Sequence, residues 1–164
     1  MGLRVALGAT LNATREAVYV ALCSSEGQRS FWTSDCDLTD TTGRFGFAQA
    51  PIDLNVAISK TPNELVSMVV TSGLPGWNGS TWSWSLSSDV ENPNVTGVQF
   101  RHVDFESDYS EDALAYTAQS WAMILDHLAR FMESGVAKPF FTNEVDEDFP
   151  VVKSWGPLDR EGHG

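Results

Sequence analysis

The chain has 164 residues, of which 42% are hydrophobic and 20% charged, a composition typical of one globular domain rather than a disordered chain. An excess of 22 acidic over 10 basic residues gives a formal net charge of −12. Such a charge repels phosphate backbones and anionic lipids, so we expect no nucleic-acid partner. There is no signal-like N-terminus and no apolar run near the roughly 20 residues of a membrane span. We therefore expect a cytoplasmic protein without membrane insertion.

The sequence shows no pattern that predicts a metal or a cofactor. Its two cysteines, Cys23 and Cys36, are too few for a disulfide framework or a metal quartet. Cys36 stands between two aspartates, whose negative field should raise its pKa and reduce its reactivity. The three histidines lack zinc-site spacing, and the acidic stretches 104–112 and 144–148 lack the calcium-loop pattern. We interpret both stretches as solvated loops.

The first third of the chain predicts a strand followed by two short helices. Residues 3–11 are typical of a strand, and Asn12 or Thr14 can cap the helix after it. The apolar face expected for this helix is Ala17, Val18, Val20 and Ala21. A second short helix or turn is expected over 26–32, with Trp32 buried.

The middle of the chain alternates with period two, the pattern of strands with one buried face. Ile52, Leu54, Val56 and Ile58 alternate with small or polar residues. Turn sequences separate the expected strands, which we place at 45–47, 52–58, 65–71, 81–86 and 97–105. Short connections between neighbouring strands indicate an antiparallel meander.

A long C-terminal helix is the clearest element. Ser110 can cap its start, Glu111 and Asp112 suit its positive end, and Gly135 can end it. Apolar residues recur at steps of three or four: Leu114, Ala118, Trp121, Leu125, Leu128 and Met132. About 24 residues would span roughly 36 Å, enough to cross a sheet. The sequence therefore predicts an α+β domain in which this helix packs on a curved sheet of about six or seven strands.

This element order resembles the helix-grip fold of the SRPBCC superfamily, which includes START domains, birch-pollen-allergen-type proteins, and polyketide cyclases and aromatases. Homologues of the activator of heat-shock-protein-90 ATPase are the most similar subgroup. The resemblance covers roughly residues 3–141, so we expect a domain over 1–141 and an acidic tail over 142–164 that packs partly on it. It rests on these segments: Ala13-Thr14-Arg15-Glu16-Ala17-Val18-Tyr19-Val20-Ala21-Leu22, Phe31-Trp32-Thr33, Gly76-Trp77-Asn78-Gly79-Ser80, Phe100-Arg101-His102, Ser120-Trp121-Ala122, Glu133-Ser134-Gly135 and Lys138-Pro139-Phe140.

The resemblance implies a ligand cavity between the sheet and the long helix. Strand alternation and the helical stripe independently direct bulky residues toward the same space. The expected lining is Trp32, Phe45, Phe47, Trp77, Trp82, Trp84, Phe100, His102, Trp121, Leu125 and Leu128. The alternative is a solid core in which these side chains pack only on one another.

Two titratable residues are candidates for catalysis, His102 and Asp53. Alternation places His102 on the inner face, where it could act as a base or could simply be satisfied by a structural hydrogen bond. Asp53 alternates away from the apolar face, so it either points into the cavity, paired with Arg44, or faces solvent.

Three hypotheses about function remain. The first is binding of a small apolar or aromatic molecule. The second is a cyclase, dehydratase or hydrolase-like enzyme that uses His102 with a carboxylate such as Asp53. The third is a protein-interaction module, including a homodimer formed through an apolar sheet face.

Overall fold

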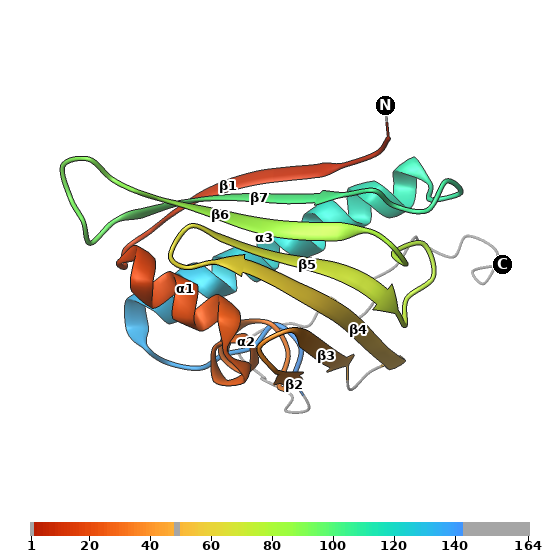
Figure 1. The fold of residues 1–164 in the computed structure, drawn as a ribbon, viewed down its shortest axis with the longest axis horizontal. Helices are drawn as coiled ribbons and strands as arrows, with labels where there is room; N and C mark the ends of the chain where they lie inside the picture. Colours follow the sequence, from red (N-terminus) through yellow and green to blue (C-terminus); the bar gives the residue numbers. More distant parts are fainter. Residues whose placement is uncertain (1, 48–49, 143–164) are drawn as a thin grey trace, which may run out of the picture.

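The computed structural model describes residues 2–47 and 50–142, and within them the alternating segments form one seven-stranded antiparallel sheet (Figure 1). Its strands are β1 (Val5–Leu11), β2 (Asp35–Leu38), β3 (Thr42–Phe47), β4 (Ala50–Thr61), β5 (Leu65–Ser72), β6 (Thr81–Ser88) and β7 (Thr96–Val103). They lie in the order β1-β7-β6-β5-β4-β3-β2. Strands β2 to β7 therefore form the predicted meander, β1 pairs with β7, and the sheet edges are β1 and β2.

Three helices accompany the sheet in the described part of the chain: α1 (Arg15–Cys23), α2 (Ser25–Phe31) and α3 (Glu111–Ser134). The side chains of Thr14, Ser24 and Ser110 cap them by accepting a backbone N–H. α3 ends at Gly135, whose φ of 70° lies in the left-handed region that glycine adopts without steric penalty. The predicted start and end of the long helix are confirmed.

The core lies between α3 and one face of the sheet. Figure 1 shows α3 crossing the sheet from behind, with α2 beside β2 and α1 next to α2. Alternate residues of the strands are buried, among them Leu54 and Val56 of β4 and Met68 of β5. α3 contributes Trp121, Ile124, Leu125 and Leu128 to this core. The architecture is the predicted α+β helix-grip fold.

Two expectations about local structure were wrong. No strand was predicted at β2, a four-residue segment that pairs with β3. The apolar face of α1 consists of Val18, Ala21 and Leu22, whereas Ala17 and Val20, which were expected on it, are exposed. In a nine-residue helix a small rotation about its axis changes which side chains are buried, and tertiary packing decides that rotation.

The end of the expected domain packs on the body. The backbone N–H of Ser34 donates to the carbonyl of Phe141, and the Phe141 ring lies 5.0 Å from that of Phe47. Of the expected tail, 142–164, only Thr142 falls within the described residues, so its packing stays a prediction. None of the described helices is both long and apolar enough to cross a membrane.

Candidate functional site

Aromatic side chains from the sheet, α3 and the end of α2 gather between the sheet and α3. The ring centroid of Trp121 lies 4.4 Å from that of Phe100 and 5.0 Å from that of Trp32. Trp82 and Trp84 lie 5.4 Å and 6.0 Å from the same ring. We call this set the aromatic cluster, and its members, none more than 2% exposed, are Trp32, Phe45, Trp82, Trp84, Phe100 and Trp121.

The remaining residues of the expected cavity lie around this cluster. Phe47 lies 5.9 Å from Trp32, and Trp77 is stacked 6.1 Å from Trp121, both at half-buried positions. Leu125 and Leu128 are buried further along α3. The rings contact one another closely, and that these residues line a ligand cavity stays a prediction.

Three indole N–H groups of the cluster have no acceptor within residues 2–47 and 50–142. The Nε1 atoms of Trp32, Trp82 and Trp84 are buried without a hydrogen-bond partner among the described residues. Nearly all buried polar groups in proteins are hydrogen-bonded, so three unpaired donors in one cluster require an explanation. The tryptophan count alone could not reveal them, because whether an indole N–H is paired depends on the packing.

His102 is inward-facing, as predicted, and both of its ring nitrogens are engaged. Its Nδ1 accepts from Nε1 of Trp121 at 3.1 Å, so in the neutral ring Nε2 carries the proton and donates to Oγ of Ser80 at 2.8 Å. Burial lowers the pKa of His102 from 6.5 to about 3. The histidine is therefore neutral near pH 7 and acts as a polar link between β6, β7 and α3.

Asp53 does not lie near His102. It is on the face of the sheet away from α3, where its side chain is 69% exposed and pairs with Nη1 of Arg44 at 2.9 Å. The hypothesis of a catalytic His102–Asp53 pair was therefore wrong, whereas the solvent-facing interpretation of Asp53 agrees with the structure. The physical reason is that an ionised carboxylate is costly to bury without a partner.

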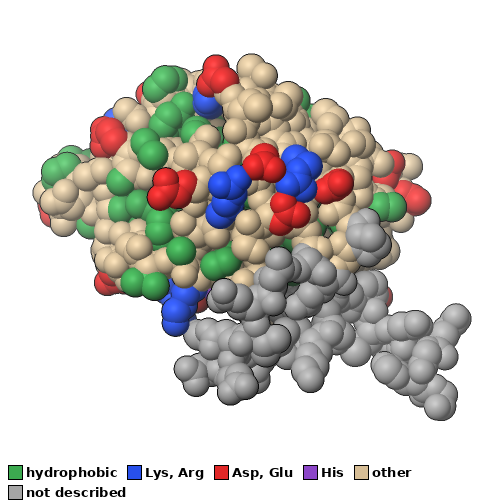
Figure 2. Space-filling view, turned by 90° about the horizontal axis from the view of Figure 1, so that it is seen from below, with side chains coloured by type: hydrophobic (Ala, Val, Ile, Leu, Met, Phe, Trp, Pro, Cys, Tyr) green, Lys and Arg blue, Asp and Glu red, His purple; other side chains and the backbone are tan. Residues whose placement is uncertain are grey.

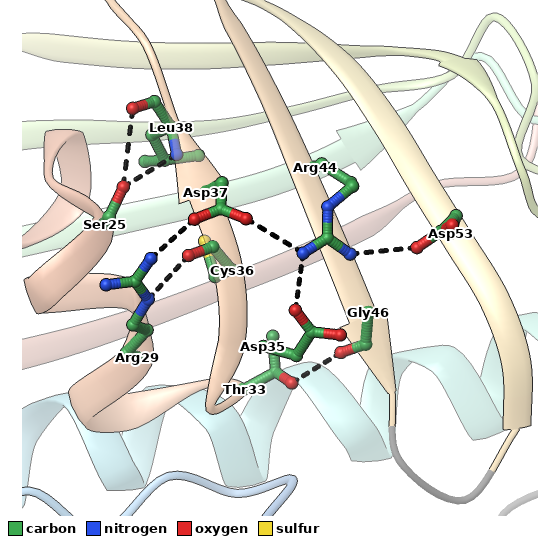
Figure 3. Close-up of polar contacts among 10 residues, drawn as sticks. All are labelled: Ser25, Arg29, Thr33, Asp35, Cys36, Asp37, Leu38, Arg44, Gly46 and Asp53. Atoms are coloured by element: carbon green, nitrogen blue, oxygen red, sulfur yellow. Dashed lines mark hydrogen bonds and ion pairs between the residues drawn. The ribbon is translucent and has the colours of Figure 1, made fainter.

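A network of charged side chains surrounds Arg44 on this outer face (Figure 3). Besides Asp53, the Arg44 guanidinium binds Asp35 and Asp37, and Asp37 also accepts from Arg29 at 2.6 Å. The hydrogen bond from Arg44 lowers the pKa of Asp37. The hydrogen bonds to Asp35, Asp37 and Asp53 together raise the pKa of Arg44. Figure 2, seen from the β2 side, shows acidic and basic side chains close together on the surface.

A shallow groove of about 400 Å³ lies beside this network, lined by polar or small residues that include Thr39, Thr42 and Asn55. It is on the outer face and is separate from the expected cavity. The nearby Cys36 is buried, and burial is the main cause that raises its pKa to about 12. The pKa of Cys36 is raised, as expected from the sequence, but the neighbouring aspartates are only a minor cause of the shift.

One end of the aromatic cluster is covered by residues from two loops, which we call the rim: Trp77, Phe105 and Tyr109. Trp77 donates from Nε1 to the hydroxyl of Tyr109 at 3.1 Å, and the rings of Phe105 and Tyr109 stack at 4.5 Å. All three are half-buried, and Phe105 lies 4.2 Å from the His102 ring. The cavity lining expected from the sequence included Trp77, but it did not include Phe105 or Tyr109, which lie in the connection between β7 and α3.

Gly76 is required for this closure. Its φ is +88°, and a Cβ built on it would lie 2.5 Å from Cδ1 of Tyr109. The absence of a side chain therefore allows both the backbone conformation and the approach of the Tyr109 ring.

No family model matches the sequence, and no curated protein matches it either. Solved structures do match. The Aha1 dimer from Colwellia psychrerythraea is 25% identical, with a TM-score of 0.69, over 81% of this chain and 98% of that chain. CalU16 from Micromonospora echinospora is 18% identical, with a TM-score of 0.58, over 80% and 77% of the two chains.

DynU16, a protein in the dynemicin biosynthetic locus, is 15% identical with a TM-score of 0.69. The match covers 85% of this chain but half of DynU16. Identities this low show the fold alone for CalU16 and DynU16. The element order, the sheet topology and these matches agree: the chain has a helix-grip fold of the SRPBCC type and is similar to Aha1.

Proposed function

We propose that this protein binds a small apolar or aromatic molecule that carries an oxygen acceptor, within the aromatic cluster between the sheet and α3. The observation that supports the proposal is the set of three buried indole N–H groups of Trp32, Trp82 and Trp84, which lack an acceptor in the part of the chain that the structure describes. Leaving a buried donor unpaired costs about 1–3 kcal/mol. A bound oxygen atom would recover part of that free energy.

The surroundings of these donors favour an apolar body for the ligand. The rings and the α3 residues Leu125 and Leu128 offer apolar surface, and ligand sites are mostly apolar with a few polar groups that fix orientation. Aromatic side chains also favour stacked or edge-on contact with another ring. An aryl ketone combines both features.

Entry of such a molecule requires a ring to move, because the interior rings contact one another. The rim residues Trp77, Phe105 and Tyr109 are half-buried, whereas the interior rings are buried. Opening the rim exposes less apolar surface than moving an interior ring, so the proposed path passes between the rim loops.

Isothermal titration calorimetry with a matched pair of probes tests the proposal. 9-Fluorenone and fluorene share a ring framework and differ in the carbonyl oxygen. We expect fluorenone to bind at least tenfold more tightly than fluorene. Trp82→Phe, which removes one donor, should reduce this preference, whereas Trp77→Phe, which removes an indole N–H that already has an acceptor, should retain it. Absence of binding by fluorenone, or equal affinity for the two probes, would overturn the proposal.

A homodimer is a second candidate, and one specific observation favours it. The Aha1 structure that this chain resembles at 25% identity is that of a dimer. Light scattering coupled to size-exclusion chromatography at 10 and 100 µM tests this candidate, and a monomeric mass at both concentrations would contradict it. The enzyme hypothesis has no comparable support, because both ring nitrogens of His102 are already hydrogen-bonded.

A further inference from the structure

The two edges of the sheet differ in how their backbone groups are satisfied. At the β2 edge, side chains of α2 bind the outer backbone groups (Figure 3). The N–H of Leu38 donates to Oγ of Ser25 at 2.7 Å, and Nε of Arg29 donates to the carbonyl of Cys36 at 2.7 Å. The strand is also only four residues long and carries two aspartates. This edge is closed to a further strand.

Helix α3 packs against β1, but within the described residues no charge, proline or bulge protects the outer edge of this strand. In Figure 1 β1 forms the outer border of the sheet, and within the described residues its backbone bonds to β7 alone. No residue between Val5 and Leu11 is charged or a proline, and the pairing with β7 is continuous without a bulge. Proteins usually protect an edge strand with charges, proline, a bulge or a covering element, so an open edge of seven residues indicates a partner strand.

We propose that β1 pairs in an antiparallel manner with β1 of a second copy of this chain. The proposal rests on the homodimer candidate above and is independent of ligand binding. A two-fold axis at Gly8 would place Val5 opposite Leu11, Ala6 opposite Thr10 and Leu7 opposite Ala9. All seven residues of the strand are then paired.

This register pairs apolar residues with apolar residues and places no like charges opposite each other. The residues on the α3 side, Val5, Leu7, Ala9 and Leu11, meet apolar partners, so the half-buried Leu7 and Ala9 lose exposed surface. The outward residues Ala6, Gly8 and Thr10 are small and exposed, which leaves room for the second strand. Arg4 falls opposite Asn12 of the partner copy, so like charges do not meet across the axis. At 0.15 M salt the Debye length of about 8 Å screens much of the repulsion between the two acidic chains.

Cysteine cross-linking tests the register directly. A Cβ at Gly8 would meet only the carbonyl oxygen of Val98, at 3.9 Å, so Gly8→Cys fits the monomer. In the proposed dimer the two new cysteines face each other about 4.5–5.5 Å apart between Cα atoms, within disulfide range. The control is Ala6→Cys. Because Ala6 lies opposite Thr10 of the second copy, the two new cysteines would be four residues apart along the strand, roughly 13 Å.

We expect Gly8→Cys to form a covalent dimer on mild oxidation in more than half of the protein, and Ala6→Cys and the wild type to stay uncross-linked. If the wild type is a dimer but both variants cross-link equally, or neither variant cross-links, the β1 interface is overturned and the homodimer remains. A monomeric wild type overturns both.

A charge at the axis gives a second test that does not depend on disulfide chemistry. Gly8→Asp places two carboxylates face to face, whereas Gln99→Glu adds the same charge at an exposed site one strand further in. We expect Gly8→Asp to raise the dimer dissociation constant at least tenfold and Gln99→Glu to change it less than threefold, with unchanged circular dichroism. Equal dissociation constants for Gly8→Asp and the wild type would overturn the interface.

Discussion

At the scale of single residues, His102 shows why an inward histidine need not be catalytic. Its two hydrogen bonds join Ser80, the residue before β6, to Trp121 of α3, and the rings of Trp77 and Phe105 lie 4.6 Å and 4.2 Å from it. Every polar atom of the ring is satisfied, so the side chain can be buried while neutral. The same burial makes it sensitive to acid.

We predict that His102 makes the protein less stable as the pH falls below 6.5. The folded protein keeps the ring neutral down to about pH 3, whereas the unfolded chain binds a proton at about pH 6.5. This contribution is therefore complete above pH 6.5 and decreases as the pH approaches 3. Between pH 7 and pH 5 it amounts to about 2 kcal/mol in the free energy of unfolding.

Urea unfolding of the wild type and of His102→Gln at both pH values measures this difference. Glutamine can still accept from Trp121 and donate to Ser80, but it does not titrate. The wild type should lose about 2 kcal/mol more than the variant between pH 7 and pH 5. Identical losses would show that His102 does not carry the pH dependence.

Gly76 and Gly79 provide a matched pair for the rim. Both have positive φ, +88° and +83°, but a Cβ at Gly79 would meet no atom within 4 Å, whereas one at Gly76 would meet the Tyr109 ring. We expect Gly79→Ala to lower the free energy of unfolding by about 1 kcal/mol, the penalty of the left-handed conformation. Gly76→Ala should lower it further and should weaken the Trp77–Tyr109 hydrogen bond. Equal losses by urea unfolding would mean that the rim contributes no stability.

Alternation along the strand predicted that His102 faces inward, but it left the side of Asp53 open and did not reveal the partners of His102. Ser80 and Trp121 are 22 and 19 residues from His102 in the sequence, and only the tertiary fold brings them together. The rim residue Tyr109 was missed for the same reason, because it lies in a loop without periodicity.

At the scale of elements, prediction succeeded where the signals are local. α3 carries its capping residues and its apolar stripe within its own segment, and its bounds agree with the structure. The alternation of Ile52, Leu54, Val56 and Ile58 likewise located β4. β2 was missed because the sequence Asp35-Cys36-Asp37-Leu38 is short and half acidic. Its pairing with β3 and its contacts with α2 decide that it is a strand, and neither is visible locally.

The cap of α3 can be tested by itself. Oγ of Ser110 accepts from the backbone N–H of Ala113 at 3.1 Å, so Ser110→Ala should lower the free energy of unfolding by about 1 kcal/mol. Ser120→Ala is the control, because Oγ of Ser120 only donates to the carbonyl of Tyr116 inside the helix and alanine has the higher helix propensity. We expect this control to be nearly neutral in thermal unfolding. A Ser110→Ala variant as stable as the control would contradict the assigned cap.

At the scale of the whole molecule, the fold gathers residues from four elements, and the residue that follows α2, into the aromatic cluster. Trp32 follows α2, Phe45 belongs to β3, Trp82 and Trp84 to β6, Phe100 to β7 and Trp121 to α3. The sequence predicted this convergence from the inward side of each element. It could not predict that the rings would contact one another, nor that three of their N–H groups would lack a partner among the described residues, since both depend on the relative positions of all these segments.

Heteronuclear NMR of the indole N–H groups tests the central claim most directly. With assignments from single Trp→Phe variants, 9-fluorenone should move at least one of the Nε1–H resonances of Trp32, Trp82 and Trp84 downfield, as expected for a new hydrogen bond to oxygen. Fluorene should leave the same resonances without a downfield shift. If saturating fluorenone moves none of the three, the cluster is a closed core and does not bind a ligand.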